Sequence, residues 1–299
     1  MPSAAGDVLL DGQLVPRATA RIAVDDLGFL LGDGAFETLR VYNGVPFLLE
    51  EHLARLFASL RALQIDLSWN RMHLQAQVRL LLEHETPLPQ DARLRITVTR
   101  GSGSAQSAAA GPPTVLITVD PYTPMTNVYE QGVLAIVSEH RRAPHPLNRV
   151  KATSYAASSW LRREAIAAGA QEALQFNTDG WLTEGGSTNV FVVDEMNVLR
   201  TPRPAEGCLK GITRNAVLTI ATESQMPWHE GEIDRAALES AREVFLTGSM
   251  VEILPVRQIG ARVIGDGHPG ALTRALHIAY RTFVDRATGR GPSSAPEGT

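Results

Sequence analysis

Two short turns, Asp11-Gly12 and Asn43-Gly44, each lie between two apolar runs, and they constrain the fold more than any other feature of the sequence. Both dipeptides favour the left-handed backbone of a tight β-hairpin. The sequence therefore predicts strand pairs at 8–15 and 36–49. In the second pair, strand alternation places an unusually polar set of side chains on one face: Phe36, Thr38, Arg40 and Tyr42.

After the second turn the hydrophobic period lengthens to that of a helix. It predicts a helix at 50–64, with Arg55 beside the apolar stripe, and a second helix at 70–85. Strands are predicted at 94–99, 114–119, 133–138, 173–176, 181–184, 190–193, 244–247 and 263–264. Further helices are predicted at 154–168, 213–224 and 272–285. This alternation predicts an α/β (α+β) fold.

The pattern lapses over 121–131, a stretch rich in Pro, Thr and Asn that is typical of a linker. We therefore expect a small α/β domain at 1–120 and a larger domain at 132–288. The tail 289–299 is rich in Gly, Pro and Ser, and we expect it to be disordered.

The composition argues against several classes of binding partner. The net charge is −4 and the basic residues are scattered, which argues against nucleic acid or an anionic membrane as partner. No run of eighteen apolar residues and no signal peptide is present, so we expect a cytoplasmic protein. The single cysteine, Cys208, and the spacing of the histidines predict no metal site. A small-molecule partner is expected.

Only two of the 28 basic residues are lysines, Lys151 and Lys210. A lysine amine can be deprotonated near neutral pH, whereas a guanidinium cannot. A Schiff base with a carbonyl compound needs such an amine. Lys151, just before the helix predicted at 154–168, is therefore either a catalytic lysine or an ordinary surface residue.

Two loops suit a phosphate group. Residues 209–214 open a predicted helix, where free amides, the helix dipole and the Thr213 hydroxyl favour an anion, although any capped helix start looks similar. Thr247-Gly248-Ser249 follows a predicted strand and allows close backbone approach. Arg55 could supply the charge, or it could be a solvated arginine.

Glu184 ends a predicted strand and is followed by Gly185-Gly186. Glycines let the backbone swing away without steric penalty, so the carboxylate could turn toward a ligand. The alternative is a plain turn with a solvated glutamate.

Together these segments resemble, in order along 8–264, the class IV aminotransferases. These are fold type IV pyridoxal-phosphate enzymes, and they include branched-chain and D-amino-acid aminotransferases and aminodeoxychorismate lyases. The segments that carry the resemblance are Gly32–Arg40, Glu51–Leu56, Lys151 with Tyr155, Glu184 with Asn189, Leu209–Arg214 and Glu252–Val256.

The resemblance implies a two-domain enzyme that uses pyridoxal 5′-phosphate. Lys151 resembles the lysine that forms the Schiff base and carries the proton. Glu184 resembles the carboxylate at the pyridine nitrogen, and Tyr155 the partner of the phenolic oxygen. The remaining cofactor residues would be Arg55, Leu209, Gly211, Ile212, Thr213, Gly248 and Ser249. The substrate pocket would comprise Phe36, Thr38, Arg40, Met250 and Val251. The family also implies a homodimer.

Three functions follow from this resemblance. The first is an aminotransferase that moves an amino group between an α-amino acid and a 2-oxo acid by a ping-pong cycle. The second is an aminodeoxychorismate lyase, which the spacing of Lys151 and Tyr155 resembles. The third is a cofactor-binding protein without catalysis. The carboxylate-binding motif of D-amino-acid aminotransferases is missing after Arg100-Gly101, and the spacing of the lysine and tyrosine also differs from that of branched-chain enzymes.

Overall fold

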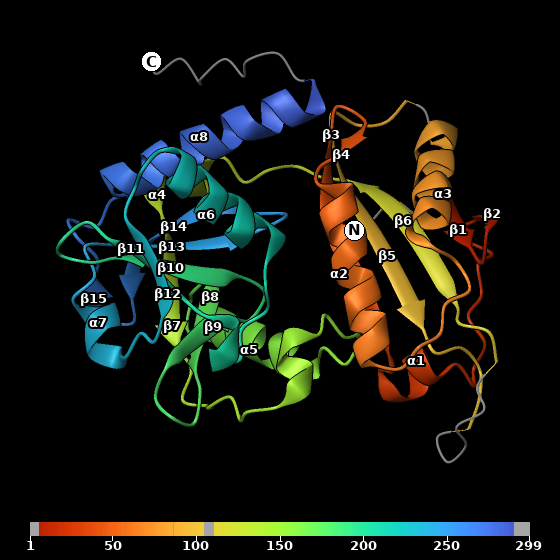
Figure 1. Cartoon of the computed structure of the whole chain (residues 1–299), viewed down its shortest axis with the longest axis horizontal. Coiled ribbons are helices and arrows are strands. Elements are labelled where there is room, and N and C mark those ends of the chain that lie inside the picture. The colour runs from red at the N-terminus through yellow and green to blue at the C-terminus, as the bar shows by residue number, and fades with distance from the viewer. Residues whose placement is uncertain (1–5, 86, 105–110, 290–299) are drawn as a thin grey trace. The chain divides into compact units, whose positions relative to one another are not determined.

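The computed structural model describes residues 6–85, 87–104 and 111–289. They form two compact units, which we describe separately (Figure 1). The first unit runs to Thr123 and also includes Val150–Tyr155. The second comprises Pro124–Arg149 and the chain from Ala156 onward. Most of the tail predicted to be disordered lies outside the described residues.

The described part of the first unit is built on one six-stranded antiparallel sheet, in the order β2-β1-β6-β5-β3-β4. Its strands are β1 (Asp7–Leu10), β2 (Gln13–Pro16), β3 (Gly34–Tyr42), β4 (Val45–Pro46), β5 (Asp91–Thr99) and β6 (Val115–Pro121). Its helices are α1 (Leu27–Leu31), α2 (Leu49–Ala62) and α3 (Arg71–His84).

Helices α2 and α3 cover one face of this sheet because both are amphipathic. Leu53, Leu56 and Leu60 of α2 are buried against the sheet. In β3, side-chain alternation directs Leu39 and Val41 into the same core. The alternate residues of β3, including Phe36 and Arg40, therefore lie on the opposite face, as the sequence predicted.

The segment Val150–Tyr155 lies along the start of β3. The N–H of Phe36 donates to the carbonyl of Lys151 at 2.9 Å, and the N–H of Thr153 donates to the carbonyl of Gly34 at 2.8 Å. These hydrogen bonds hold Val150–Tyr155 against the sheet of the first unit. The sequence had instead predicted that this segment belongs to the second domain, at 132–288.

The second unit contains a mixed sheet in the order β12-β11-β10-β13-β14-β7-β8-β9, with β15 paired to β14. Its strands are β7 (Val133–Val137), β8 (Glu172–Phe176), β9 (Leu182–Gly185), β10 (Asn189–Val193), β11 (Leu199–Pro202), β12 (Trp228–Gly231), β13 (Glu243–Gly248), β14 (Glu252–Ile259) and β15 (Arg262–Val263). Its helices are α4 (Asn127–Gln131), α5 (Ala156–Ala167), α6 (Ile212–Glu223), α7 (Arg235–Glu239) and α8 (Ala271–Thr288), with 3-10 turns η1 (Pro146–Arg149) and η2 (Pro204–Glu206).

Most of the predicted strands and helices are confirmed, whereas β11, β12, β14, α1, α4 and α7 were not predicted. Three of these, β14, α1 and α4, have clear local causes. Strand β14 contains Pro255, a residue that argues against a central strand because it cannot donate to the ladder. Helix α1 has five residues, too few for a helical period to be read. Helix α4 lies inside the stretch expected to be a linker.

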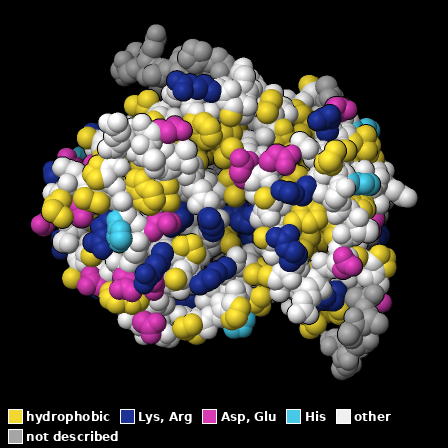
Figure 2. All heavy atoms as spheres, in the orientation of Figure 1, with side chains coloured by type: hydrophobic (Ala, Val, Ile, Leu, Met, Phe, Trp, Pro, Cys, Tyr) yellow, Lys and Arg dark blue, Asp and Glu magenta, His cyan; other side chains and the backbone are white. Residues whose placement is uncertain are grey.

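No helix in the described ranges is both long and apolar enough to cross a membrane. Acidic and basic side chains are interspersed over the face of the molecule in Figure 2.

Candidate functional site

Four side chains of the first unit meet beside β3, and we call them the Lys151 group: Phe36, Arg95, Lys151 and Tyr155. The Lys151 amine lies 4.6 Å from the centre of the Phe36 ring. The Tyr155 ring meets the same ring edge-on, with centroids 5.4 Å apart. The Arg95 guanidinium lies 3.9 Å from that centre. Three predicted site residues are thus brought together.

The close approach of residues 150–155 to β3 depends on Gly34. A Cβ at this position would lie 2.6 Å from the carbonyl oxygen of Val98 and 3.0 Å from the Thr153 hydroxyl. A larger residue would therefore push the segment away from the strand. The N–H of Lys151 also donates to the Ser59 hydroxyl of α2 at 3.4 Å, which places the lysine backbone from a second side.

Sequence reasoning missed Arg95. It pairs directly with Thr38 across β3 and β5, so both side chains lie on one face of the sheet. Burial and the nearby charge of Arg93 lower the pKa of Arg95, while Tyr155 opposes that shift. The alternation of arginines in 91–99 was the available signal, but using it required the register of the two strands.

Arg40 lies on the same face but is held by other residues. Its side chain is 1% exposed and donates to Asp91 from Nε at 3.1 Å and from Nη2 at 3.0 Å. The guanidinium also stacks on the rings of Tyr42 and Tyr122. Its assignment to the substrate pocket stays a prediction, as does that of the half-buried Thr38.

A second polar cluster, the Glu37 cluster, comprises Glu37, His52 and Arg55 and lies on the helix-covered face of β3. Arg55 donates to both oxygens of Glu37 at 2.7 Å, in a bidentate pair. His52 contacts one of those oxygens through Nδ1, also at 2.7 Å. The carboxylate has no exposed surface. The predicted phosphate ligand Arg55 is therefore oriented by two residues that the sequence did not single out.

The charges in the Glu37 cluster are fixed by their contacts. Burial alone would raise the pKa of Glu37, but the Arg55 cation and the hydrogen bonds from Arg55 and His52 outweigh it and lower the pKa to about 2. Burial lowers the pKa of His52 from 6.5, although Glu37 partly opposes this. At neutral pH, Glu37 is therefore charged and His52 is neutral.

This cluster predicts acid sensitivity. The pKa of Glu37 is about 2 in the folded state against an ordinary 4.5, so ionisation of this carboxyl stabilises the folded state by about 3 kcal/mol. This stabilisation is fully present above pH 4.5 and is lost as the pH falls toward 2. His52, with its folded pKa below 6.5, shifts stability in the same direction. Glu37→Gln is expected to lower the free energy of unfolding by about 3 kcal/mol at pH 7, and this deficit should shrink on acidification.

Urea unfolding of both proteins across this pH range checks the prediction. Glu50→Gln is the control, because Glu50 is an exposed carboxylate on α2, the helix that carries His52 and Arg55, and it is expected to change stability by less than about 0.5 kcal/mol. A deficit for Glu37→Gln that stays constant with pH would contradict the assigned protonation states.

In the second unit, a buried carboxylate organises another set of residues, the Glu184 group: Arg142, Glu184, Asn189 and Leu209. The Glu184 carboxylate accepts three hydrogen bonds. They come from Arg142 at 2.5 Å, from the N–H of Leu209 at 2.8 Å and from the side-chain amide of Asn189 at 3.2 Å. The Asn189 amide also donates to the carbonyl of Leu209 at 2.8 Å. Glu184 is thus turned inward and held from three sides. Arg142 was not predicted.

Helix α6 begins beside this group, at the loop predicted to bind phosphate. Gly211 precedes the helix and no side chain caps it. The first N–H groups of an α-helix lack partners within the helix, and the dipole there favours an anion. A Cβ on Gly211 would lie 1.9 Å from the Asn189 amide oxygen, so only glycine fits. Ile212 and Thr213, both buried, occupy the first turn.

The second predicted loop, Thr247-Gly248-Ser249, covers the end of β13 and the start of the turn Ser249–Val251, which joins β13 to β14. The N–H of Val251 donates to the carbonyl of Gly248 at 3.1 Å and closes the turn. Just before it, the buried hydroxyl of Thr247 has no hydrogen-bond partner in the described ranges. Thr247 pairs with Asn189 across β10 and β13, so its hydroxyl lies on the Asn189 side of the sheet. A buried hydroxyl without a partner is a position where a polar ligand fits.

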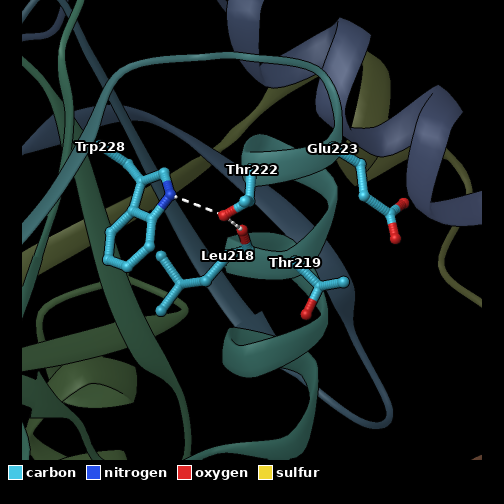
Figure 3. Close-up of a pocket in the computed structure, with 5 residues that line it drawn as sticks. All are labelled: Leu218, Thr219, Thr222, Glu223 and Trp228. Carbon is cyan, nitrogen blue, oxygen red and sulfur yellow. Dashed lines mark hydrogen bonds between the residues drawn. The ribbon is translucent and has the colours of Figure 1, made fainter.

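A hollow of about 340 Å³ opens beside the last turns of α6 (Figure 3). Trp228 lines it and donates to the Thr222 hydroxyl at 2.8 Å. Its lining contains no predicted site residue. Among the residues that the structure describes, no group of three or more His, Cys, Asp or Glu could hold a metal ion.

Comparisons with known proteins identify the same family that the sequence motifs resemble. A family model described as amino-transferase class IV matches residues 34–259. A "putative branched-chain-amino-acid aminotransferase" of Methanocaldococcus jannaschii is 35% identical over 279 residues, covering 92% of this chain and 95% of its own. The D-alanine aminotransferase of Bacillus licheniformis is 33% identical, covering 93% and 96%.

Solved structures give the same result. The branched-chain aminotransferase of Thermoproteus uzoniensis, determined with norvaline, has a TM-score of 0.87 at 29% identity and covers 96% of both chains. A second branched-chain aminotransferase structure, determined with pyridoxamine 5′-phosphate, has a TM-score of 0.87 at 26% identity, with the same coverage.

Proposed function

We propose that this chain, which belongs to the class IV aminotransferase family, transfers an amino group between an α-amino acid and a 2-oxo acid by a ping-pong cycle through a Schiff base at Lys151. It is an aminotransferase, and its cofactor is pyridoxal 5′-phosphate. The observation that most supports the proposal is the placement of the Lys151 amine against the Phe36 ring, beside Tyr155 and Arg95.

The residues present fit this cofactor. When bound, it supplies an aldehyde that bonds to an amine and a ring that accepts electrons from the substrate α-carbon. In our proposal the Lys151 amine would hold the cofactor at its aldehyde carbon, and the same amine would move the proton at the substrate α-carbon. Tyr155 would donate to the phenolic oxygen. Phe36 keeps an apolar surface beside the amine.

We assign the ring nitrogen to Glu184. A carboxylate there favours the protonated ring, and the donors in the Glu184 group fix its orientation. Leu209 would pack against the ring. The phosphate is assigned to the amides and hydroxyls of Gly211–Thr213 and Gly248-Ser249, together with Arg55. The uncapped start of α6 and the buried Thr247 hydroxyl support this assignment.

The substrate pocket is proposed to include Phe36, Thr38, Arg40, Met250 and Val251, and we add Arg95. A guanidinium binds a carboxylate bidentately, and every substrate of this reaction carries one. Arg95 lies 3.9 Å from the same ring that the Lys151 amine contacts.

The decisive experiment supplies an amino donor without an acceptor. An aminotransferase is expected to release one equivalent of 2-oxo acid per bound cofactor and then stop until an oxo acid is added. Aminodeoxychorismate is tested in the same way, and continuous release of pyruvate from it without an oxo acid, with no product from the amino donors, would instead indicate an elimination. No product from the donors or from aminodeoxychorismate would indicate a non-catalytic protein. The donors are L-leucine, L-glutamate and D-alanine, so the same assay assigns stereochemistry.

We also propose a homodimer. Several large apolar residues at 22–31 of the first unit are exposed, including Val24 at 83% and Phe29 at 74%. An apolar patch of this kind is typical of a protein interface. Light scattering is expected to give about twice the chain mass of 32.4 kDa, and a monomer mass would contradict the proposal.

A further inference from the structure

We propose that Glu252 and His277 are positioning residues that fix the turn Ser249–Val251 for cofactor and substrate. The inference rests on the proposed function, which assigns Ser249 to the phosphate and Met250 and Val251 to the substrate. Neither Glu252 nor His277 belongs to those assigned sets.

The backbone of Glu252 is the first observation. Gly248 and Glu252 pair across β13 and β14, which leaves a three-residue loop between them. The residue after such a loop commonly adopts a left-handed conformation, where glycine is favoured. Glu252 occupies this region with a φ of 54°. A glutamate in this conformation is strained, and such strain persists only where surrounding contacts hold it.

The side chain supplies those contacts. Glu252 is 1% exposed, and its carboxylate meets Nε2 of His277 at 2.9 Å and the Arg281 guanidinium at 3.8 Å. Both partners lie on α8, which packs against β13 and β14. The His277 ring lies in turn against the Tyr129 ring, with centroids 4.6 Å apart. The end of the turn is thus tied to a long helix through a buried carboxylate.

This tie fixes three adjoining residues before any ligand binds. Turns of this kind can adopt more than one backbone arrangement, and a shift of about 1 Å in a binding group can lower catalytic efficiency by up to 100-fold. Glycine at 252 would keep the left-handed backbone without strain and lose the tie to α8. It therefore separates the role of the side chain from the role of the backbone.

The experiment compares Glu252→Gly, Glu252→Gln and His277→Phe as purified holoenzymes. Glutamine can still hydrogen-bond His277, and phenylalanine keeps a ring beside Tyr129 without bonding Glu252. We expect Glu252→Gly and His277→Phe to raise the Kd for pyridoxal phosphate and the KM for both substrates by roughly 10-fold. Glu252→Gln should stay within about threefold. We expect Tm to change little in Glu252→Gly, because lost strain offsets lost contacts.

Two controls make the outcome specific. Gln225→Gly replaces another left-handed residue of the second unit, exposed and after α6, and is expected to leave KM unchanged.

Ser249→Ala tests the assignment of the turn itself. If Ser249→Ala leaves the cofactor Kd unchanged, the assignment of the turn fails, and this inference fails with it. If Ser249→Ala weakens binding while Glu252→Gly and His277→Phe do not, the inference alone is overturned. A rise in KM that occurs only with a fall in Tm would likewise overturn a positioning role.

Discussion

Lys151→Ala is expected to abolish covalent attachment of the cofactor and to lower kcat by at least about 10³-fold. The reason is that, in our proposal, this one amine would both hold the cofactor covalently and move the substrate proton. Borohydride reduction followed by peptide mass spectrometry measures the attachment, and amino transfer measures the rate. In the original chain, the modified peptide should contain residue 151.

Lys210→Ala is the matched control, since Lys210 is the other lysine and is exposed. It is expected to retain both the covalent attachment and most of the activity. Covalent cofactor in Lys151→Ala, or its loss in Lys210→Ala, would show that the reactive lysine is assigned wrongly.

Glu184→Gln is expected to lower kcat by about 100-fold or more while the protein stays folded. The amide cannot offset the positive charge of a protonated ring. Arg142 donates to Glu184 at 2.5 Å. Replacing the Glu184 carboxylate by an amide therefore leaves this arginine without an anionic partner in the group. The remaining arginine would then disfavour the protonated ring by repulsion.

Glu206→Gln serves as the comparison for this variant. Glu206 is also a largely buried glutamate of the second unit that pairs with an arginine, Arg203, at 2.6 Å. It is expected to keep activity within about twofold. Equal losses of activity in the two variants would mean that Glu184 acts through stability and not through the ring nitrogen.

The sequence predicted the elements whose signals are local. The hairpins follow from Asp11-Gly12 and Asn43-Gly44, and helix α2 follows from its apolar stripe. Lys151 was singled out by rarity alone, and the roles of Glu184 and the loop before α6 came from the order of motifs. These features need no knowledge of which strands pair.

The missed residues depend on pairing between distant segments. Arg95 enters the Lys151 group only through the register of β3 and β5. Glu37 meets His52 and Arg55 because α2 covers one particular face of β3. Arg142 reaches Glu184 across 42 residues of sequence. In each case the residue type was visible in the sequence, but its partner was not.

The return of residues 150–155 to β3 has a consequence for how this protein could be divided. A gene fragment that ends at residue 123 would encode the first sheet without the lysine that lies against Phe36. A fragment that begins at residue 124 would encode that lysine without Gly34 and Phe36, whose backbone groups bond its segment. The Lys151 amine and the strand that supports its segment are therefore encoded together only in a gene that spans both fragments.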